Sequence, residues 1–587
     1  MLPKPIKDEH TRVTSLTSET NVSVPMRDGT VLRADVYRPS GPGRWPVLLS
    51  RIPYGKHKPR YRALHLDPVR AASRGYVVVV QDVRGRHNSK GVFYPFRHEA
   101  DDGFDTVEWC AAQPWSDGNV GMFGMSYHGA TQWLAAIQAP PSLKAIAPGL
   151  TSDNYYDSWT YLGGVFQLWW TAQWAADFAR DSVTGTPPEK ADAAAELRRW
   201  VKDPLAMSRH LPVMEMPALK GLADYYYDWL AHPTYDDYWK AMSPCERFDR
   251  VEVPVLNIGG YYDSFVRGTL RSLQGVAEQG ATGLARGQQH LLLGPWIHSH
   301  LLPPSAGQRY FGAAASGEAL DYHGMVLSWS DRWLKGEDNG VDSDPRVYYF
   351  LMGTNAWRSL DQWPPESCET AYFLRSSGRA NASADDGALS LDPPKEREVS
   401  DSYLYNPMNP VPTVGGPYIR GIPGLVQTGV EEQTQVERRE DVLVYTSRPL
   451  DRDLEVTGNV TLTLWAVTSA PDTDWTAKLT VVHPDGSSYN ICEGILRASF
   501  RESLERTVPV EPGTAYQYQI DLGPTAMLFQ RGHRIRLQVS SSNFPAFARN
   551  LNTGGPAYEE KEARTAIQTV LHDANHPSRL VLPVVGS

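Results

Sequence analysis

Apolar runs and amphipathic segments alternate along the first part of the chain. The runs "WPVLLS" and "GYVVVVQDVRG" predict buried parallel strands, and residues 21–39 predict a hairpin that turns at Asp28 and Gly29. The segment "EADDGFDTVEWCAAQ" predicts a helix whose acidic beginning suits the positive end of its dipole. This order of strands and helices predicts a doubly wound α/β sheet up to about residue 149.

Residues 150–242 lose the strand pattern, and Trp, Tyr and Ala dominate there. In "FQLWWTAQWAADF", Phe166, Trp170 and Trp174 recur every fourth residue, so they predict one aromatic face of a helix. This face either packs in the core or, if the helices cover the strand ends, forms walls of a substrate pocket. Strands return with "VPVLNIGGYYDSF" and "HLLLGPWIHSH", and a helix over 322–334 follows.

After about residue 344 the pattern changes to short alternating runs such as "RVYYFLMG", "VTLTLWAV" and "RIRLQVSSS", separated by Gly, Pro, Asp and Asn. Such runs are typical of an all-β sandwich or jelly roll. We therefore predict a discontinuous α/β body of residues 1–149 and 243–344, a helical cap of residues 150–242, and a C-terminal jelly-roll (galactose-binding-like) domain of residues 345–587.

Length and charge narrow the class of protein. A chain of 587 residues is too long for a single core, which supports the division into domains. Its formal net charge of −10 argues against nucleic acid or an anionic membrane as a partner. No apolar run reaches bilayer length and the first twenty residues lack a signal-peptide core, so we expect a cytoplasmic protein, or a secreted one whose leader has been removed. The four cysteines lie far apart and predict neither disulfides nor a zinc site.

The stretch "GMFGMSYHGATQW" places Ser126 between a predicted strand, residues 119–123, and a predicted helix, residues 127–138. A sharp turn there would expose the serine hydroxyl beside the free N–H groups at the helix start, as in a nucleophile elbow. The usual elbow is G-x-S-x-G, whereas His128 stands at the second glycine position. The alternative is that Ser126 only caps the helix.

A serine nucleophile needs a histidine as base and an acid to orient it, in the chain order Ser, Asp, His for an α/β-hydrolase. Asp263 and His298 each follow a predicted strand and fit that order. Other residues compete for the same roles: His128, His290 and His300 as the base, and Asp82 and Asp153 as the acid. A metal site on His298 and His300 is a minor alternative, because no H-E-x-x-H motif accompanies it.

Several stretches together resemble the bacterial cocaine esterase family of serine hydrolases, which also holds X-prolyl dipeptidyl aminopeptidases and α-amino acid ester hydrolases. The similarity runs in order from about residue 20 to the C-terminus, and the family's elbow is Gly-x-Ser-Tyr-x-Gly. The stretches that carry it are "VPMRDGTVLRADVYRP", "RIPYGK", "QDVRGRHNSKGVF", "WSDGNVGMFGMSYHGATQW", "GGYYDSFVRG", "GPWIHSH" and "VSSSNFP".

The resemblance implies a role for each site residue. Ser126 becomes the nucleophile, His298 the general base and Asp263 its partner. The oxyanion hole comes from the backbone N–H of Tyr127 and the hydroxyl of Tyr54, since a tetrahedral intermediate needs two donors. The resemblance also implies an acyl pocket and, behind the elbow, structural support held in hydrogen bonds: Trp159, Trp174 and Phe265 for the pocket, Asp82 and Arg84 for the support.

The substrate follows from the same similarity. In the α-amino acid ester hydrolases, carboxylates two and three residues after the triad aspartate hold the substrate ammonium, whereas Phe265 and Val266 stand there in this chain. By the same resemblance, Asp177 and Arg420 stand at positions where the cocaine esterase family has apolar residues of the pocket. We therefore expect a serine carboxylesterase for small esters of apolar or aromatic acids, without cofactor or metal, and compatible with a homo-oligomer. The alternatives are an X-prolyl dipeptidyl aminopeptidase or α-amino acid ester hydrolase, and a non-catalytic carbohydrate-binding protein.

Overall fold

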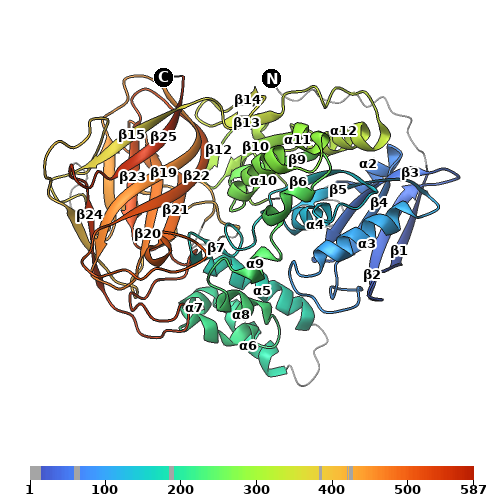
Figure 1. Ribbon diagram of the computed structural model, residues 1–587, viewed down its shortest axis with the longest axis horizontal. Helices are drawn as coiled ribbons and strands as arrows, with labels where there is room; N and C mark the ends of the chain where they lie inside the picture. The colour runs from blue at the N-terminus through green and yellow to red at the C-terminus, as the bar shows by residue number, and fades with distance from the viewer. Residues whose placement is uncertain are drawn as a thin grey trace.

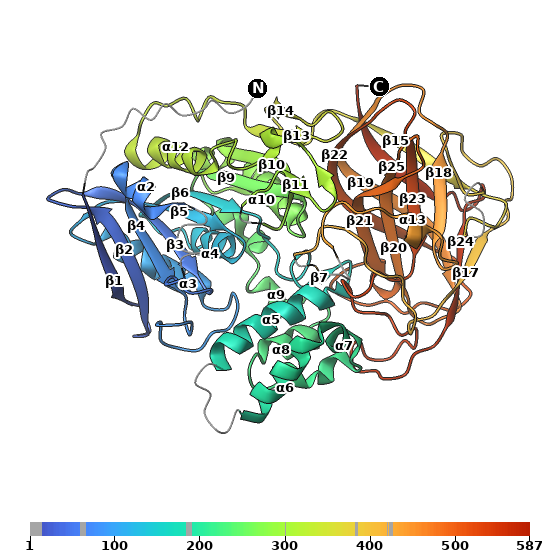
Figure 2. The same cartoon turned by 180° about the vertical axis from the view of Figure 1, so that it is seen from behind.

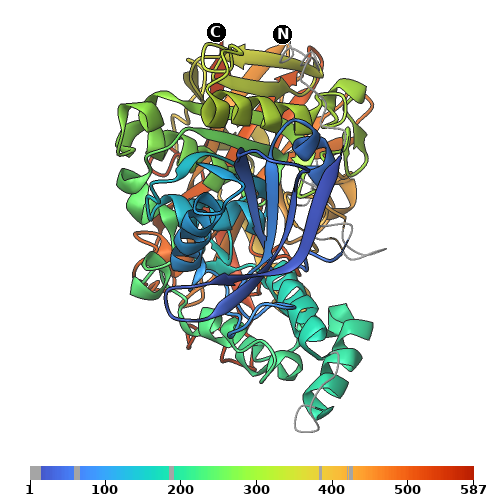
Figure 3. The same ribbon diagram turned by 90° about the vertical axis from the view of Figure 1, so that its right-hand side faces the viewer.

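Three parts make up the molecule: an α/β body, a β-sandwich beside it, and a helical cap that lies at one end of both (Figure 1). The computed structural model describes residues 15–58, 66–183, 191–299, 301–381, 386–419, 421 and 427–586. The view from behind shows the same division, with the cap helices below the junction of body and sandwich (Figure 2). In Figure 3 the blue strands of the body lie in front of the orange and red strands of the sandwich.

One mixed sheet forms the centre of the body. Its central strands run parallel, and antiparallel strands lie at each edge. In sheet order the strands are β1 (Leu16–Pro25), β2 (Val31–Pro39), β4 (Val77–Asp82), β3 (Trp45–Ile52), β5 (Ser116–Met125), β6 (Leu143–Gly149), β9 (Val255–Tyr262), β10 (Gln289–Ile297), β13 (Val347–Leu351) and β14 (Ala356–Leu360).

Helices cover both faces of this sheet, and β4 shows why. Val78 and Val80 belong to one core with helices α2 and α12, whereas Val77 and Val79 belong to another with α3 and α4. Because successive strand residues point to opposite faces, a strand of valines buries a row of side chains against each layer. The body helices are α2 (Pro68–Ser73), α3 (Glu99–Ala111), α4 (Tyr127–Ala136), α10 (Val266–Gln279), α11 (Gly283–Gly287) and α12 (Tyr322–Lys335).

The cap is inserted between β6 and β9. Its aromatic helix begins at Leu168, so Phe166 precedes the helix while Trp170 and Trp174 lie on it, 3% and 5% exposed. The cap elements are the hairpin β7 (Tyr161–Leu162) and β8 (Val165–Phe166), and helices α5 (Leu168–Val183), α6 (Ala191–Lys202), α7 (Pro204–Arg209), α8 (Tyr225–Ala231) and α9 (Asp237–Lys240). No helix in the described ranges is both long and apolar enough to cross a bilayer.

The C-terminal part is an all-β sandwich whose strands alternate as the sequence predicts. On β23, for example, Ile535, Leu537 and Val539 all point into one core. The order is β17 (Asp401–Tyr405), β24 (Ala566–Leu571), β19 (Leu454–Thr468), β25 (Arg579–Val585), β15 (Cys368–Arg375), β16 (Ala388–Ser390), β18 (Leu443–Ser447), β23 (Arg534–Ser540), β20 (Asp474–Val482) and β21 (Ser488–Arg497), and β22 (Tyr516–Phe529) pairs with β19. The predicted fold class, an α/β-hydrolase body with a helical cap and an all-β C-terminal domain, is confirmed.

The strand pairing differs from the predicted start of the β domain at residue 345. The run "RVYYFLMG" contains β13, which pairs in parallel with β10 of the body, and β14 pairs with β13. The body sheet therefore continues to Leu360. A five-residue alternating run fits either a body edge or a sandwich, so its pattern alone does not decide between them.

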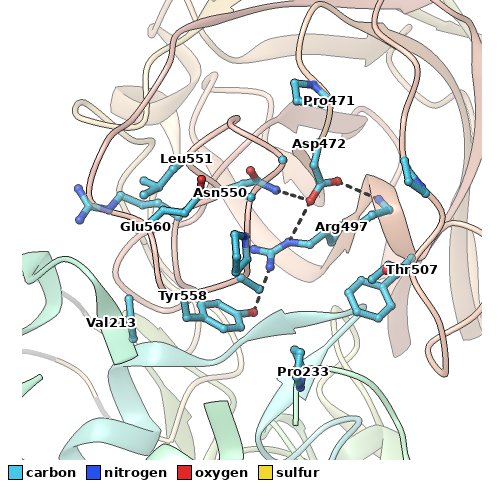
Figure 4. Close-up of a pocket in the computed structure, with 18 of the residues that line it drawn as sticks. Val213, Pro233, Pro471, Asp472, Arg497, Thr507, Asn550, Leu551, Tyr558 and Glu560 are labelled. Carbon is cyan, nitrogen blue, oxygen red and sulfur yellow. Dashed lines mark hydrogen bonds and ion pairs between the residues drawn. The ribbon is translucent and has the colours of Figure 1, made fainter. Parts of the chain in front are cut away.

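A cavity of about 370 Å³ lies between the cap and the sandwich. Val213 and Pro233 of the cap face Tyr558 and Arg497 of the sandwich across it (Figure 4). Buried Arg497 pairs with Asp474 at 2.9 Å and donates to the Tyr558 hydroxyl at 3.2 Å. Its described lining contains none of the predicted catalytic residues, so the cavity is separate from the candidate active site.

Candidate active site

Ser126 stands at the predicted sharp turn between β5 and α4. Its backbone adopts φ 63° and ψ −129°, a conformation rare for a residue with a side chain and found mainly at functional sites. Its side chain makes no capping hydrogen bond to the helix, which argues against the alternative that Ser126 is only an N-cap. Ser126 N–H donates to Gly149 O at 2.8 Å and ties the turn to β6.

The two glycines of the elbow are needed because other chain segments approach closely. Gly124 has φ +126°, and a Cβ there would lie 2.6 Å from the Cβ of His128. A Cβ on Gly129 would lie 2.7 Å from Thr151 Cγ2, which follows β6. The second close approach is thus at residue 129, one position later than in G-x-S-x-G, which leaves room for the side chain of His128.

Asp263 and His298 meet because the strands before them are neighbours. β9 and β10 are parallel, and Tyr262 pairs with Ile297 in their register. The next residue of each strand therefore leaves the same end of the sheet. His298 Nδ1 lies 2.5 Å from Asp263 Oδ2, and His298 Nε2 lies 3.0 Å from Ser126 Oγ. The structure thus brings the three predicted catalytic residues into one hydrogen-bonded series.

The competing residues have other partners. His128 Nδ1 is 2.9 Å from Ser50 Oγ, and His290 Nε2 is 3.1 Å from Gln288 Oε1. Both rings are buried, and burial lowers the pKa of His128 to about 3 and that of His290 to about 4. His300 lies outside the described residues. Within the described ranges no group of three or more His, Cys, Asp or Glu is placed to hold a metal ion.

The competing aspartates are also engaged elsewhere. Asp82 Oδ1 accepts the Lys56 N–H at 2.8 Å. Asp153 lies at the start of the cap and does not face solvent. Its carboxylate is fully buried and accepts two 2.7 Å hydrogen bonds from Arg271 of α10, because an unpaired charge could not be buried there.

Asp177 and Arg420 are the two charged residues expected at positions of the pocket, and the structure describes the first of them. Asp177 pairs with Arg180 at 2.9 Å and remains 28% exposed. Arg420 lies outside the described residues. The predicted support residue Arg84 is held as expected, with hydrogen bonds to both carboxylate oxygens of Asp102 at 3.0 and 2.6 Å and to Asp28 at 2.7 Å.

A buried polar network fixes Tyr127, whose backbone N–H is the predicted first oxyanion donor. The Tyr127 hydroxyl donates to Glu99 Oε1 at 3.0 Å and accepts from Phe96 N–H at 3.0 Å. Glu99 in turn pairs with Arg51 at 3.0 Å, and both charges are at most 2% exposed. Burial raises the pKa of Glu99, and the Arg51 charge opposes that shift. At the start of α4 the Tyr127 N–H has no partner within the helix.

Reasoning from the sequence missed this network. Its only signal is that Arg51 directly follows the apolar run "WPVLLS", where a charge has to be buried with a partner. The partner, Glu99, begins a helix and looks like an ordinary acidic first-turn residue.

The turn that carries Tyr54 is clamped by buried charges. Lys56 Nζ lies 3.1 Å from Asp35 and 3.7 Å from Asp82, and all three side chains are at most 7% exposed. Arg86 donates to the carbonyl of Pro53 at 2.9 Å. The Tyr54 hydroxyl accepts a 3.4 Å hydrogen bond from Trp174 Nε1 of the cap, so this side chain touches both the body and the cap.

The predicted pocket aromatics form a continuous series beside the triad. Phe265 contacts the His298 ring edge-on at 5.3 Å and stacks on Trp159 at 4.4 Å, and Trp159 lies 6.5 Å from Trp174. Trp159 and Phe265 are fully buried, whereas Trp174 keeps 5% of its surface exposed. The series therefore links the triad to the cap and to Tyr54.

A strained elbow serine, a histidine and a carboxylate in series at the carboxyl ends of parallel strands define a serine hydrolase with the α/β-hydrolase fold. Residues 28–300 match the family model of X-Pro dipeptidyl-peptidase (S15 family), and residues 339–581 match that of the X-Pro dipeptidyl-peptidase C-terminal non-catalytic domain. The chain is 38% identical to cocaine esterase of Rhodococcus sp. (strain MB1 Bresler) over 96% of this chain and 98% of that protein. The chain therefore belongs to the S15 family of serine hydrolases that includes cocaine esterase.

Solved structures share the whole architecture. An aminopeptidase from a marine sediment Thaumarchaeota archaeon has a TM-score of 0.81 and 26% identity, covering 100% of this chain and 98% of that one. An α-amino acid ester hydrolase has a TM-score of 0.76 and 24% identity, covering 99% and 98% of the two chains. The similarity to the α-amino acid ester hydrolase shows that the two proteins share a fold.

Proposed function

We propose that this hydrolase is a serine carboxylesterase that cleaves esters of apolar or aromatic acids through an acyl-enzyme. The observation that carries the proposal is the series of hydrogen bonds from Ser126 Oγ through His298 to Asp263 at a strained elbow. The similarity to cocaine esterase over nearly the full length of both chains supports ester substrates.

In the proposed reaction, Ser126 Oγ attacks the ester carbonyl carbon while His298 takes the hydroxyl proton, and Asp263 stabilises the resulting imidazolium. The Tyr127 N–H and the Tyr54 hydroxyl donate to the oxyanion. When the tetrahedral intermediate collapses, the C–O bond to the alcohol breaks and His298 gives its proton to the leaving alkoxide. Water, deprotonated by His298, then cleaves the acyl-enzyme and releases the acid.

The aromatic series favours an apolar acyl group. Trp174, at 5% exposed, is the least buried of the three, so we place it against the acyl chain, with Trp159 and Phe265 behind it. Phe265 and Val266, at the positions where amine-recognising relatives carry carboxylates, offer no charge to an ammonium group. A substrate with a free amino group would lose its hydration there without a compensating partner.

The test uses the purified protein and its Ser126→Ala variant with 4-nitrophenyl acetate, butyrate and benzoate, a phenylglycine methyl ester and a Gly-Pro anilide. We expect a burst and steady turnover on the plain esters, both lost in the variant. Turnover restricted to the anilide or the amino ester would overturn the carboxylesterase proposal in favour of the peptidase or amino acid ester hydrolase alternative.

A further inference from the structure

His128 occupies an unusual place two residues after the proposed nucleophile. It belongs to the first turn of α4, is 1% exposed, and takes the position where an ordinary elbow has glycine. Its Cβ lies so close to Gly124 that it is part of the elbow's packing. A buried imidazole at such a position needs a polar partner and a steric reason to be there.

The polar partner of His128 lies on the strand that leads to Tyr54. Ser50 is on β3, four residues before Tyr54, and its Oγ is 2.9 Å from His128 Nδ1. Both side chains are buried, so water does not compete for this hydrogen bond. The bond therefore fixes the helix that follows the proposed nucleophile to the strand that leads to Tyr54, the proposed second oxyanion donor.

The ring of His128 also holds Tyr54 directly. The two rings stack with centroids 5.9 Å apart and planes 26° apart, and Phe178 of the cap contacts the Tyr54 ring at 5.6 Å. Trp174 contacts the hydroxyl end of the same side chain. Tyr54 thus has neighbours from the elbow helix and from the cap, and His128 is its contact on the elbow helix.

From these contacts we infer that His128 is a positioning residue, which sets the place of the Tyr54 hydroxyl relative to Ser126 and thereby completes the oxyanion hole. The inference rests on the proposed function, because it assigns no chemistry to His128 itself. Displacement of a catalytic group by about 1 Å can lower turnover by about 10²-fold, so a stacking and hydrogen-bonding residue at this place affects the rate without touching substrate.

The experiment is a double-mutant cycle between His128→Leu and Tyr54→Phe, with 4-nitrophenyl butyrate as the probe. We expect His128→Leu to lower kcat by about 10- to 100-fold in the wild-type background while KM changes little. In the Tyr54→Phe background the same substitution should lower kcat by no more than about twofold, since the hydroxyl it positions is already absent. A loss of equal size in both backgrounds would overturn the inference.

Two further variants separate positioning from general damage to the fold. His128→Phe keeps a ring against Tyr54 and should recover part of the kcat that His128→Leu loses; equal losses would contradict the stacking role. Ser50→Ala removes only the hydrogen bond and should also lower kcat in a way that depends on Tyr54, so it carries the test if His128→Leu does not fold.

The matched control is the substitution His290→Leu. His290 is also a buried histidine that has a hydrogen-bond partner, Gln288, and that contacts an aromatic ring, Trp329 at 5.1 Å. It lies at the opposite end of β10 from His298, so its kcat should equal that of the wild type. Failure of the proposed function has a different signature: Ser126→Ala would stay active, or Tyr54→Phe alone would leave kcat unchanged.

Discussion

Replacement of Tyr127 by phenylalanine separates the stability of the elbow from its chemistry. The substitution keeps the ring and the backbone N–H but removes a hydroxyl that donates to Glu99 and accepts from Phe96 N–H, both at 3.0 Å. A hydrogen bond to a charged group contributes about 1.5–3 kcal/mol, and a buried N–H left without a partner costs about 1–3 kcal/mol. We therefore expect the free energy of unfolding to fall by roughly 3–5 kcal/mol.

The assay compares urea unfolding curves, where a lower midpoint at unchanged slope reports a loss of stability. Loss of an oxyanion donor lowers kcat by about 10²-fold or more. The folded variant should lose much less of its kcat for 4-nitrophenyl butyrate, because the backbone N–H of residue 127 remains. The control is Tyr155→Phe in the same cluster, where Tyr155 stacks on Phe96 at 3.7 Å. The Tyr155 hydroxyl has no hydrogen-bond partner among the described residues, so its removal should cost little.

Two results would refute this reasoning. If Tyr127→Phe unfolds at the wild-type midpoint, the hydroxyl network does not stabilise the elbow. If Tyr155→Phe is as destabilising as Tyr127→Phe, the effect reflects ring packing and not the two hydrogen bonds.

Three further predictions test other parts of the site. Gly124→Ala should yield inactive, destabilised protein in activity and urea assays, because its Cβ would lie 2.6 Å from that of His128, and wild-type behaviour would contradict the close approach. Lys56→Met leaves two buried carboxylates without their cation, so the free energy of unfolding should fall by about 3–5 kcal/mol, and kcat should fall because the turn that carries Tyr54 loosens. If neither quantity falls, the buried ion pairs of Lys56 do not hold this turn in place. Burial lowers the pKa of His128 to about 3, below its value of about 6.5 in the unfolded chain, so its contribution to the free energy of unfolding is fully present above about pH 6.5 and is lost as the pH falls toward 3. Between pH 6.5 and 3 the free energy of unfolding of His128→Leu should therefore decline less than that of the wild type. Parallel declines would contradict the lowered pKa.

The sequence was sufficient to predict that Ser126, Asp263 and His298 lie close together, because each follows a strong local pattern. Ser126 stands between an apolar strand and a helix, and Asp263 and His298 each end an apolar run. Parallel strands carry the residues that follow them to one edge of the sheet, so the order of elements brings the three together. The resemblance to a family added Tyr54, for which no local pattern indicates a role.

The parts that the sequence did not predict depend on contacts between distant segments. Arg51 and Glu99 show no common pattern along the chain, and their pairing arises only when α3 packs on β3. The ion pair of Asp153 is not evident along the chain, because its partner Arg271 is more than a hundred positions away. The assignment of β13 to the body likewise required its pairing with β10.

The insertion of the whole cap between β6 and β9 bears on how such an enzyme can diversify. These two strands are neighbours in the sheet, so their pairing closes a loop that contains the entire cap. The entropy of loop closure grows only with the logarithm of length, by about 0.6 kcal/mol for each doubling. A longer or rebuilt cap would therefore change the walls of the proposed acyl pocket at little cost to folding, while Ser126, Asp263 and His298 remain on a scaffold that the insertion does not interrupt.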